Sequence, residues 1–212
     1  MKIKSFTFNP FQENTYVVYD ETKDCVIIDP GCYTEAEKTE LRRFITIEGL
    51  NPVKLINTHC HIDHILGNKF VSELWNLELF MHKDDLPLLE NAVNTGKMYG
   101  FEDYEGIPLP KHFLAQGDTL TFGKSSFKIL FTPGHAPGHI CLYSKENNLV
   151  IAGDVLFQGS IGRTDLPGGD HNTLIKSIIT QLFPLPNETQ VFCGHGPVTN
   201  IGYEKQHNPF LK

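Results

Sequence analysis

Four apolar, strand-like runs in this chain each lead to a residue that can bind a metal ion. The pairs are VKLIN (53–57) with His59, FKILFTPG (127–134) with His135, LVIAG (149–153) with Asp154, and TQVFCG (189–194) with His195. Glycine stands directly before the last three of these residues and allows the backbone to approach closely. If the strands are neighbours, their ends meet at one edge, so the fold has to gather these side chains there.

The first of these strand ends carries the stretch THCHIDH (58–64), which places three histidines and one aspartate within six positions. Packing gives no reason for such polar crowding at a strand end. The predicted metal ligands in this stretch are His59, His61, Asp63 and His64. Side chains alternate in an extended segment, so Cys60 faces away from His59 and His61 and is predicted not to bind metal.

The two observations together predict a dinuclear metal site. The seven candidate ligands are His59, His61, Asp63, His64, His135, Asp154 and His195. One zinc ion takes about four ligands, so seven indicate two ions that share a bridging carboxylate. All donors are nitrogen or oxygen, which suits zinc first, with iron or manganese as alternatives. Two ions roughly 3.5–4 Å apart hold and ionise a water molecule near neutral pH.

The remaining histidines are interpreted more plainly. His139 follows His135 by four positions, and the sequence leaves open whether it supports a ligand or hydrogen-bonds to the backbone. The others are taken as ordinary core or surface residues, namely His82, His112, His171 and His207.

The order of the predicted elements is strands with helices, followed by strands with helices again. A capping box at Thr34 and Glu37 predicts a helix that ends near Gly49. This order predicts an α/β protein whose two similar halves pack sheet to sheet within a single domain, residues 1–212. Residues 96–116 are rich in glycine, proline and aromatic residues, so they are expected to form a long surface loop, either a lid beside the site or a plain connection packed on the core.

Composition excludes several partners. A net charge of −7 is the opposite of the basic surface that nucleic-acid binders need. No apolar run approaches the roughly 18 residues that span a membrane, and the N-terminus lacks the apolar segment of a signal peptide. Five cysteines without a CxxC pair indicate reduced thiols. We therefore expect a cytoplasmic protein that binds neither nucleic acid nor a membrane; the sequence gives no indication of its oligomeric state.

With these motifs in hand, the chain resembles the metallo-β-lactamase superfamily. HxHxDH, TPGH, GD and GHG occur in that order over nearly the whole sequence. The resemblance implies a four-layer αββα sandwich with the metal site at one edge of the sheets. It also implies that one metal is bound by His59, His61 and His135, that the second is bound by Asp63, His64 and His195, and that Asp154 bridges them.

Within that superfamily the chain is most similar to the glyoxalase II group, the hydroxyacylglutathione hydrolases, and in particular to short bacterial members without a C-terminal helical domain. The similarity lies in GDVLFQGSIGRTDLPGGD (153–170), GHGPVTNIGYE (194–204) and NPF (208–210). It implies that a metal-bound hydroxide attacks a thioester such as S-lactoylglutathione, with Asp63 and Asp154 at the catalytic centre.

One position departs from the glyoxalase II pattern. Arg163 matches a basic residue of that group, but Asp165 stands where a tyrosine is typical. Arg163 is therefore expected either to bind a substrate carboxylate or to form a salt bridge with Asp165 or Asp170.

Two other functions stay open. The persulfide dioxygenases share THCHxDH and an Arg-Thr-Asp run and hold a single iron through residues that match His59, His135 and Asp154. His139 is an argument against a persulfide dioxygenase, because those enzymes usually lack this second histidine. A non-catalytic metal-binding module is the third hypothesis, although no ligand of the pattern is missing.

Overall fold

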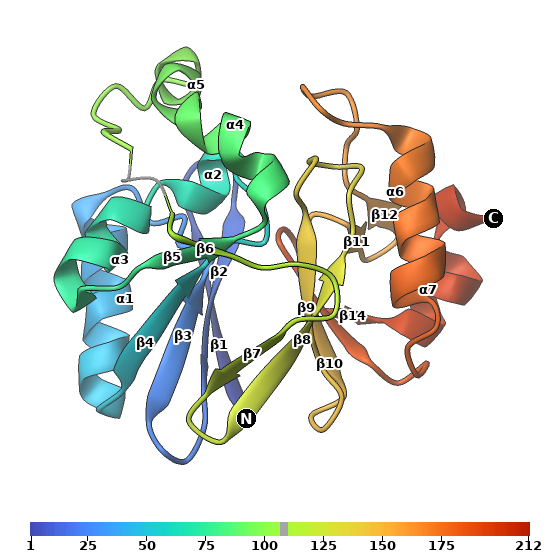
Figure 1. Ribbon diagram of the computed structural model, residues 1–212, viewed down its shortest axis with the longest axis horizontal. Coiled ribbons are helices and arrows are strands. Elements are labelled where there is room, and N and C mark those ends of the chain that lie inside the picture. Colours follow the sequence, from blue (N-terminus) through green and yellow to red (C-terminus); the bar gives the residue numbers. More distant parts are fainter. Residues whose placement is uncertain (107–109) are drawn as a thin grey trace. The chain divides into compact units, whose positions relative to one another are not determined.

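The computed structural model describes residues 1–106 and 110–212, which form two units. The first is Met1–Phe113 with Thr121–Ser125, and the second is Leu114–Leu120 with Ser126–Lys212. One six-stranded sheet lies in the first unit, and the other lies in the second unit except for residues 121–122 and 125. Each unit also has its own helices (Figure 1). Each therefore supplies one sheet layer and one helix layer, which are the layers that the predicted sandwich needs. The single-domain assignment stays a prediction.

The first sheet has the strand order β1-β2-β3-β4-β5-β6. These strands are Lys2–Phe8, Glu13–Tyr19, Asp24–Ile28, Asn51–Ile56, Leu79–Met81 and His112–Phe113. The first three pair antiparallel, whereas β3, β4, β5 and β6 pair in parallel. Because parallel strands end at the same edge, the segments that follow β3, β4 and β5 all start there.

The helices of the first unit are α1 (Glu35–Glu48), α2 (Ile62–Ile65), α3 (Asn68–Trp75), α4 (Leu86–Glu90) and α5 (Ala92–Met98), with a 3₁₀ turn at Lys83–Asp85. The capping box predicted for α1 is present, and Gly49 ends the helix with φ of 62°. Helices α1 and α3 lie on one face of the sheet (Figure 1), where Leu41, Ile45 and Val71 join its buried core.

Two expectations for the first unit need correction. The ligand stretch is not extended throughout, because α2 places Asp63 and His64 on a short helix. Residues 96–116 are also not one surface loop: α5 runs to Met98, and β6 lies at the sheet edge. Phe101 and Tyr104 are buried in the first core, as the plain-connection alternative requires. Residues 107–109 of this range lie outside the described part of the chain.

The second sheet has the strand order β14-β13-β10-β9-β8-β7. These strands are Thr199–Asn200, Gln190–Cys193, Leu149–Gly153, Ile140–Ser144, Ser125–Phe131 and Thr119–Phe122. Strand β9 is antiparallel to both β8 and β10, and β10 is parallel to β13. Strands β8, β10 and β13 therefore run in one direction, and the predicted ligands that follow them leave from the same edge.

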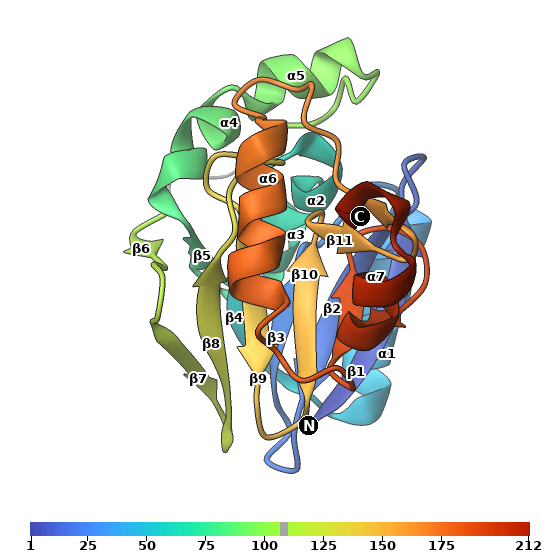
Figure 2. The same cartoon turned by 90° about the vertical axis from the view of Figure 1, so that its right-hand side faces the viewer.

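Helix α6 (His171–Ser177), extended by a π-helical turn at Ile178–Leu182, lies along one face of this sheet (Figure 2). The sequence interpretation missed the small hairpin β11 (Leu156–Phe157) and β12 (Ser160–Ile161) and the helix α7 (Ile201–His207), which a 3₁₀ turn at Pro209–Leu211 follows. Buried Glu204 joins these elements, because it accepts the Gly159 N–H at 3.0 Å. Within the described ranges, no helix is long and apolar enough to cross a membrane.

Candidate metal centre

The first unit brings its four predicted ligands together where β4 ends and α2 begins. The His59 and His61 rings lie with their centroids 4.8 Å apart, and those of His59 and His64 are 4.1 Å apart. Nε2 of His64 lies 3.6 Å from Oδ2 of Asp63. The turn after β1 supports this arrangement, because the Asn9 side-chain amide donates to the Asp63 carbonyl at 2.9 Å.

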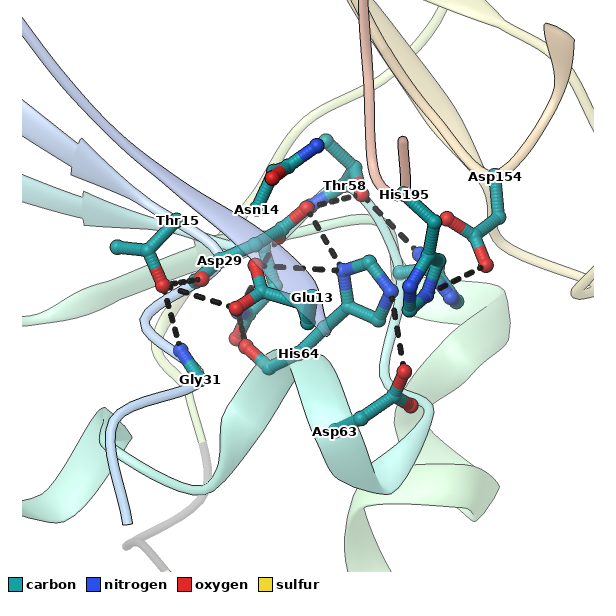
Figure 3. A network of polar contacts seen from close by, with 12 residues as sticks. Glu13, Asn14, Thr15, Asp29, Gly31, Thr58, Asp63, His64, Asp154 and His195 are labelled. Carbon is teal, nitrogen blue, oxygen red and sulfur yellow. Dashed lines mark hydrogen bonds and ion pairs between the residues drawn. The ribbon is translucent and has the colours of Figure 1, made fainter. Parts of the chain in front are cut away.

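Asp29 fixes the orientation of the His64 ring through Nδ1 (Figure 3). Its Oδ2 lies 3.2 Å from Nδ1 of His64 and also accepts the Thr58 hydroxyl at 2.6 Å. Its Oδ1 accepts the Thr58 N–H at 2.7 Å. A histidine that donates Nδ1–H to a carboxylate keeps the lone pair of Nε2 for a metal, so Asp29 selects the binding tautomer.

A second buried carboxyl group lies next to this network. Oε1 of Glu13 is 3.9 Å from Nδ1 of His64, and Oε2 accepts the Thr15 hydroxyl at 2.9 Å. Burial raises the pKa of Glu13 well above its ordinary value, although nearby His64 lowers it. Cys60 is also buried, which raises the pKa of its thiol, and Asp85 raises it further.

The second unit brings together its three predicted ligands, which are Asp154 and the two histidines beside it. Oδ2 of Asp154 lies 3.4 Å from Nε2 of His135. The same oxygen lies 3.5 Å from Nε2 of His195 (Figure 3). Nδ1 of His135 lies 2.7 Å from the Arg163 carbonyl, to which it donates in the tautomer that leaves the lone pair on Nε2. Asp154 therefore lies between two histidines, as a shared ligand would.

The donor atoms within each unit have the spacing of ligands on a common ion. Two donors that each lie about 2.1 Å from one tetrahedral zinc are about 3.4 Å apart. The three carboxylate–imidazole distances are 3.6 Å in the first unit and 3.4 and 3.5 Å in the second. These distances exceed the usual 2.7–3.2 Å of an N–H···O hydrogen bond. The residues therefore fit divalent metal ions.

His139 is buried and hydrogen-bonds to the backbone of Asp154, a predicted ligand, so both alternatives that the sequence left open apply to it. Its Nε2 accepts the backbone N–H of Asp154 at 3.0 Å, and its Nδ1 lies 3.1 Å from the Thr132 hydroxyl. Because one ring nitrogen accepts the Asp154 N–H, His139 holds the backbone that carries the Asp154 carboxylate.

Two glycines allow close approach in this half of the site. A Cβ atom at Gly134 would overlap the backbone of Leu174, and the φ of Gly134 is +128°. A Cβ atom at Gly162 would overlap the Asp154 carbonyl and contact Nδ1 of His135. Both positions need glycine because the chain segments around the ligands touch directly.

Arg163 forms the salt bridge that one of the sequence alternatives described. Its Nε and a terminal nitrogen donate to the two carboxylate oxygens of Asp165 at 2.7 and 2.8 Å. This contact with the guanidinium lowers the pKa of Asp165 to about 2. Both side chains are exposed, at 59% and 68%, so the ion pair remains accessible to solutes.

The family model of the metallo-β-lactamase superfamily matches residues 8–195. The chain belongs to the metallo-β-lactamase superfamily. Among curated relatives, the probable metallo-hydrolase YqgX of Bacillus subtilis is 39% identical over 214 residues, which cover 100% of this chain and 98% of the relative. The hydroxyacylglutathione hydrolase GloC of Haemophilus influenzae is 38% identical, with coverages of 100% and 98%.

Solved structures of the superfamily are similar over nearly the whole chain. BLEG-1, a B3 metallo-β-lactamase, has a TM-score of 0.91 and 37% identity, with full coverage of both chains. TTHA1623, in a di-iron-bound form, has a TM-score of 0.87 and 39% identity, with coverages of 98% and 100%. ETHE1 from Myxococcus xanthus has a TM-score of 0.80 and 28% identity, with coverages of 99% and 84%.

These findings confirm the predicted metallo-β-lactamase fold and support a metal-dependent hydrolase that uses divalent ions. Sequence reasoning missed Asp29 and Thr58 as supports of the ligands. A signal for Asp29 was present: it directly follows the apolar strand CVII, as Asp154 follows LVIAG.

Proposed function

We propose that the ligand groups of the two units together hold two divalent metal ions and that the protein hydrolyses thioesters. The observation that carries the metal site is the spacing of 3.4–3.6 Å between carboxylate oxygen and imidazole nitrogen in each group. In support, the family model covers all seven candidate ligands in sequence order. Zinc is our first choice of ion, and the di-iron form of TTHA1623 keeps iron as an alternative.

Each side chain has a defined task in this proposal. His59, His61 and His135 hold one ion, and Asp63, His64 and His195 hold the other, with Asp154 shared. When bound, such ions supply Lewis acidity and lower the pKa of water. Asp63, whose side chain is 14% exposed, is accessible to accept a hydrogen bond from the attacking water and to orient it.

The thioester substrate rests on similarity to a named hydrolase. GloC, which is 38% identical over its whole length, carries the name hydroxyacylglutathione hydrolase. We therefore propose a hydroxyacylglutathione, similar to S-lactoylglutathione, as the substrate, with the exposed guanidinium of Arg163 as a contact for a substrate carboxylate. Asp165 weakens that contact because it already accepts two of the guanidinium N–H groups.

A mononuclear iron persulfide dioxygenase is the second candidate. The Arg163–Asp165 ion pair favours it, because this pair is built from the Arg-Thr-Asp run that the chain shares with those enzymes. His139 favours the hydrolase instead, because the persulfide dioxygenases usually lack this histidine. Here it is fully buried, and its Nε2 accepts the Asp154 N–H, so it specifically supports the shared ligand.

The test combines metal analysis with two activity assays on the same preparation. We expect two metal ions per chain, hydrolysis of S-lactoylglutathione, and no oxygen uptake with glutathione persulfide. His64→Ala should lose one ion and most turnover, whereas His207→Ala, a change at an exposed histidine, should lose neither. One ion per chain together with oxygen uptake would replace the hydrolase by the dioxygenase. Two ions without turnover would leave the metal site standing and reject the thioester.

A further inference from the structure

Asp85 is a carboxylate that the sequence places at the start of a helix but that the structure uses elsewhere. It directly precedes α4, and aspartate is a preferred N-cap residue. Its side chain makes no capping hydrogen bond, and Pro87 in the first turn has no N–H to offer. Oδ2 of Asp85 instead accepts the backbone N–H of Cys60 at 2.8 Å, and Asp85 is 0% exposed.

The amide that Asp85 binds lies between two candidate metal ligands. Cys60 follows His59 and precedes His61, whose rings are 4.8 Å apart. The Cys60 side chain is 2% exposed, and its Sγ lies 3.7 Å from Sδ of Met81, at the end of β5. The segment Met81–Asp85 therefore holds Cys60 by its amide and by its side chain. The two neighbouring histidines, which alternate with it, face the other way.

This restraint matters because a thiolate is a strong ligand for zinc and other soft ions. A cysteine between two histidine ligands would compete with them if the backbone at Cys60 rotated. A hydrogen bond from a buried amide to a carboxylate opposes that rotation, because breaking it would leave both groups buried without that bond.

We propose that Asp85 is a positioning residue that presents His59 and His61 to the metal and keeps the Cys60 thiol out of the metal centre. The inference rests on the proposed role of both histidines as ligands and is independent of the substrate. It adds a requirement to the site: the nitrogen and oxygen donor set depends on a carboxylate that acts through its bond to the Cys60 amide.

Cobalt substitution of the full-length protein tests this role through a signal other than activity. Cobalt bound by a thiolate shows a sulfur-to-metal charge-transfer band in the near ultraviolet, and cobalt bound by nitrogen and oxygen does not. We expect no such band in the wild type or in Asp85→Asn, which keeps an oxygen that accepts the Cys60 N–H. Asp85→Ala should show the band and bind cobalt roughly 10- to 100-fold more weakly.

Two further variants make the result specific. The double variant Asp85→Ala/Cys60→Ser should lose the band, which assigns it to Cys60. Asp84→Ala removes the same charge at an exposed neighbouring position and should match the wild type. If Asp85→Ala does not fold, Asp85→Ser takes its place, because the shorter side chain cannot reach the Cys60 amide.

The outcomes separate this role from the proposed function. A folded Asp85→Ala or Asp85→Ser protein with wild-type cobalt affinity and no thiolate band would overturn the inference. A thiolate band in the wild type would overturn it too, because Cys60 would then be a ligand. If the protein does not hydrolyse thioesters, the proposed substrate is rejected. If, in addition, no variant differs from the wild type in its cobalt spectrum, the result for Asp85→Ala rejects this role as well.

Discussion

Replacing Asp29 by asparagine should change which nitrogen of His64 carries the proton. Oδ1 of Asp29 accepts the Thr58 N–H at 2.7 Å, so the oxygen of the new side-chain amide has to take that place. The amide NH₂ then replaces Oδ2, which lies 3.2 Å from Nδ1 of His64. Because an NH₂ group donates, Nδ1 must accept and the proton moves to Nε2. That proton occupies the lone pair that a metal needs.

The expected loss concerns metal affinity more than folding. Removing an outer partner of a histidine ligand typically costs 10- to 100-fold in metal affinity, or about 1.4–2.7 kcal/mol. The backbone tolerates the change, since Asp29 has φ of 48° and asparagine also adopts this left-handed conformation. The loss of charge in the Thr58 bonds costs about 1 kcal/mol of folding free energy, which corresponds to a fall in Tm of about 2–4 °C.

Calorimetric metal titration measures the affinity, and ¹⁵N NMR of the metal-free protein reports the His64 tautomer directly. Asp20→Asn is the matched control, because Asp20 is also buried and accepts the N–H groups of Thr22 and Lys124. This control should lose stability but keep its metal affinity. If Asp29→Asn keeps both ions at wild-type affinity and His64 keeps its proton on Nδ1, the tautomer argument is wrong.

Three further outcomes are expected. Gly134→Ala should lower activity and Tm far more than Gly117→Ala. Both glycines have positive φ, a strain that alone costs a non-glycine residue about 1–3 kcal/mol, but a Cβ would overlap backbone only at Gly134. Equal Tm values would contradict this. Burial raises the pKa of the Cys141 thiol to about 12. The unfolded chain therefore loses this proton first, and the free energy of unfolding should fall as pH rises above about 8.5. Urea titrations at pH 8 and 10, with Cys141→Ala as comparison, measure this. Arg163→Ala should raise the KM for an anionic thioester roughly 10- to 100-fold, and Asp165→Asn should lower this KM. A neutral thioester is the control. Equal changes for both substrates would limit the ion pair to a structural role.

Strand ends could be predicted from the sequence because the apolar runs and the residues that follow them are local signals. The positions of the candidate ligands after β4, β8, β10 and β13 follow from these signals, and each unit gathers its own candidates at one sheet edge. The capping box of α1 is equally local, since Thr34 and Glu37 satisfy each other's backbone groups.

The rest depends on contacts between distant residues. Phe101 and Tyr104 looked like aromatics of a lid, but they are buried in the first core, and only tertiary packing decides that. Asp85 has the sequence context of a helix cap, yet its partner is the Cys60 amide, 25 positions earlier. A pattern read along the chain cannot distinguish these uses of the same residue type.

The carbonyl of Arg163, which lies 2.7 Å from Nδ1 of His135, has a consequence for how this protein can diversify. The orientation of His135 depends on a main-chain atom, so it is unaffected by the identity of the side chain at position 163. That side chain is exposed and can be exchanged by mutation while His135 stays in place. Substitutions at position 163 can therefore change this exposed surface without disturbing His135, whereas a substitution at Asp29 removes the atom that orients His64, because that atom belongs to the side chain itself.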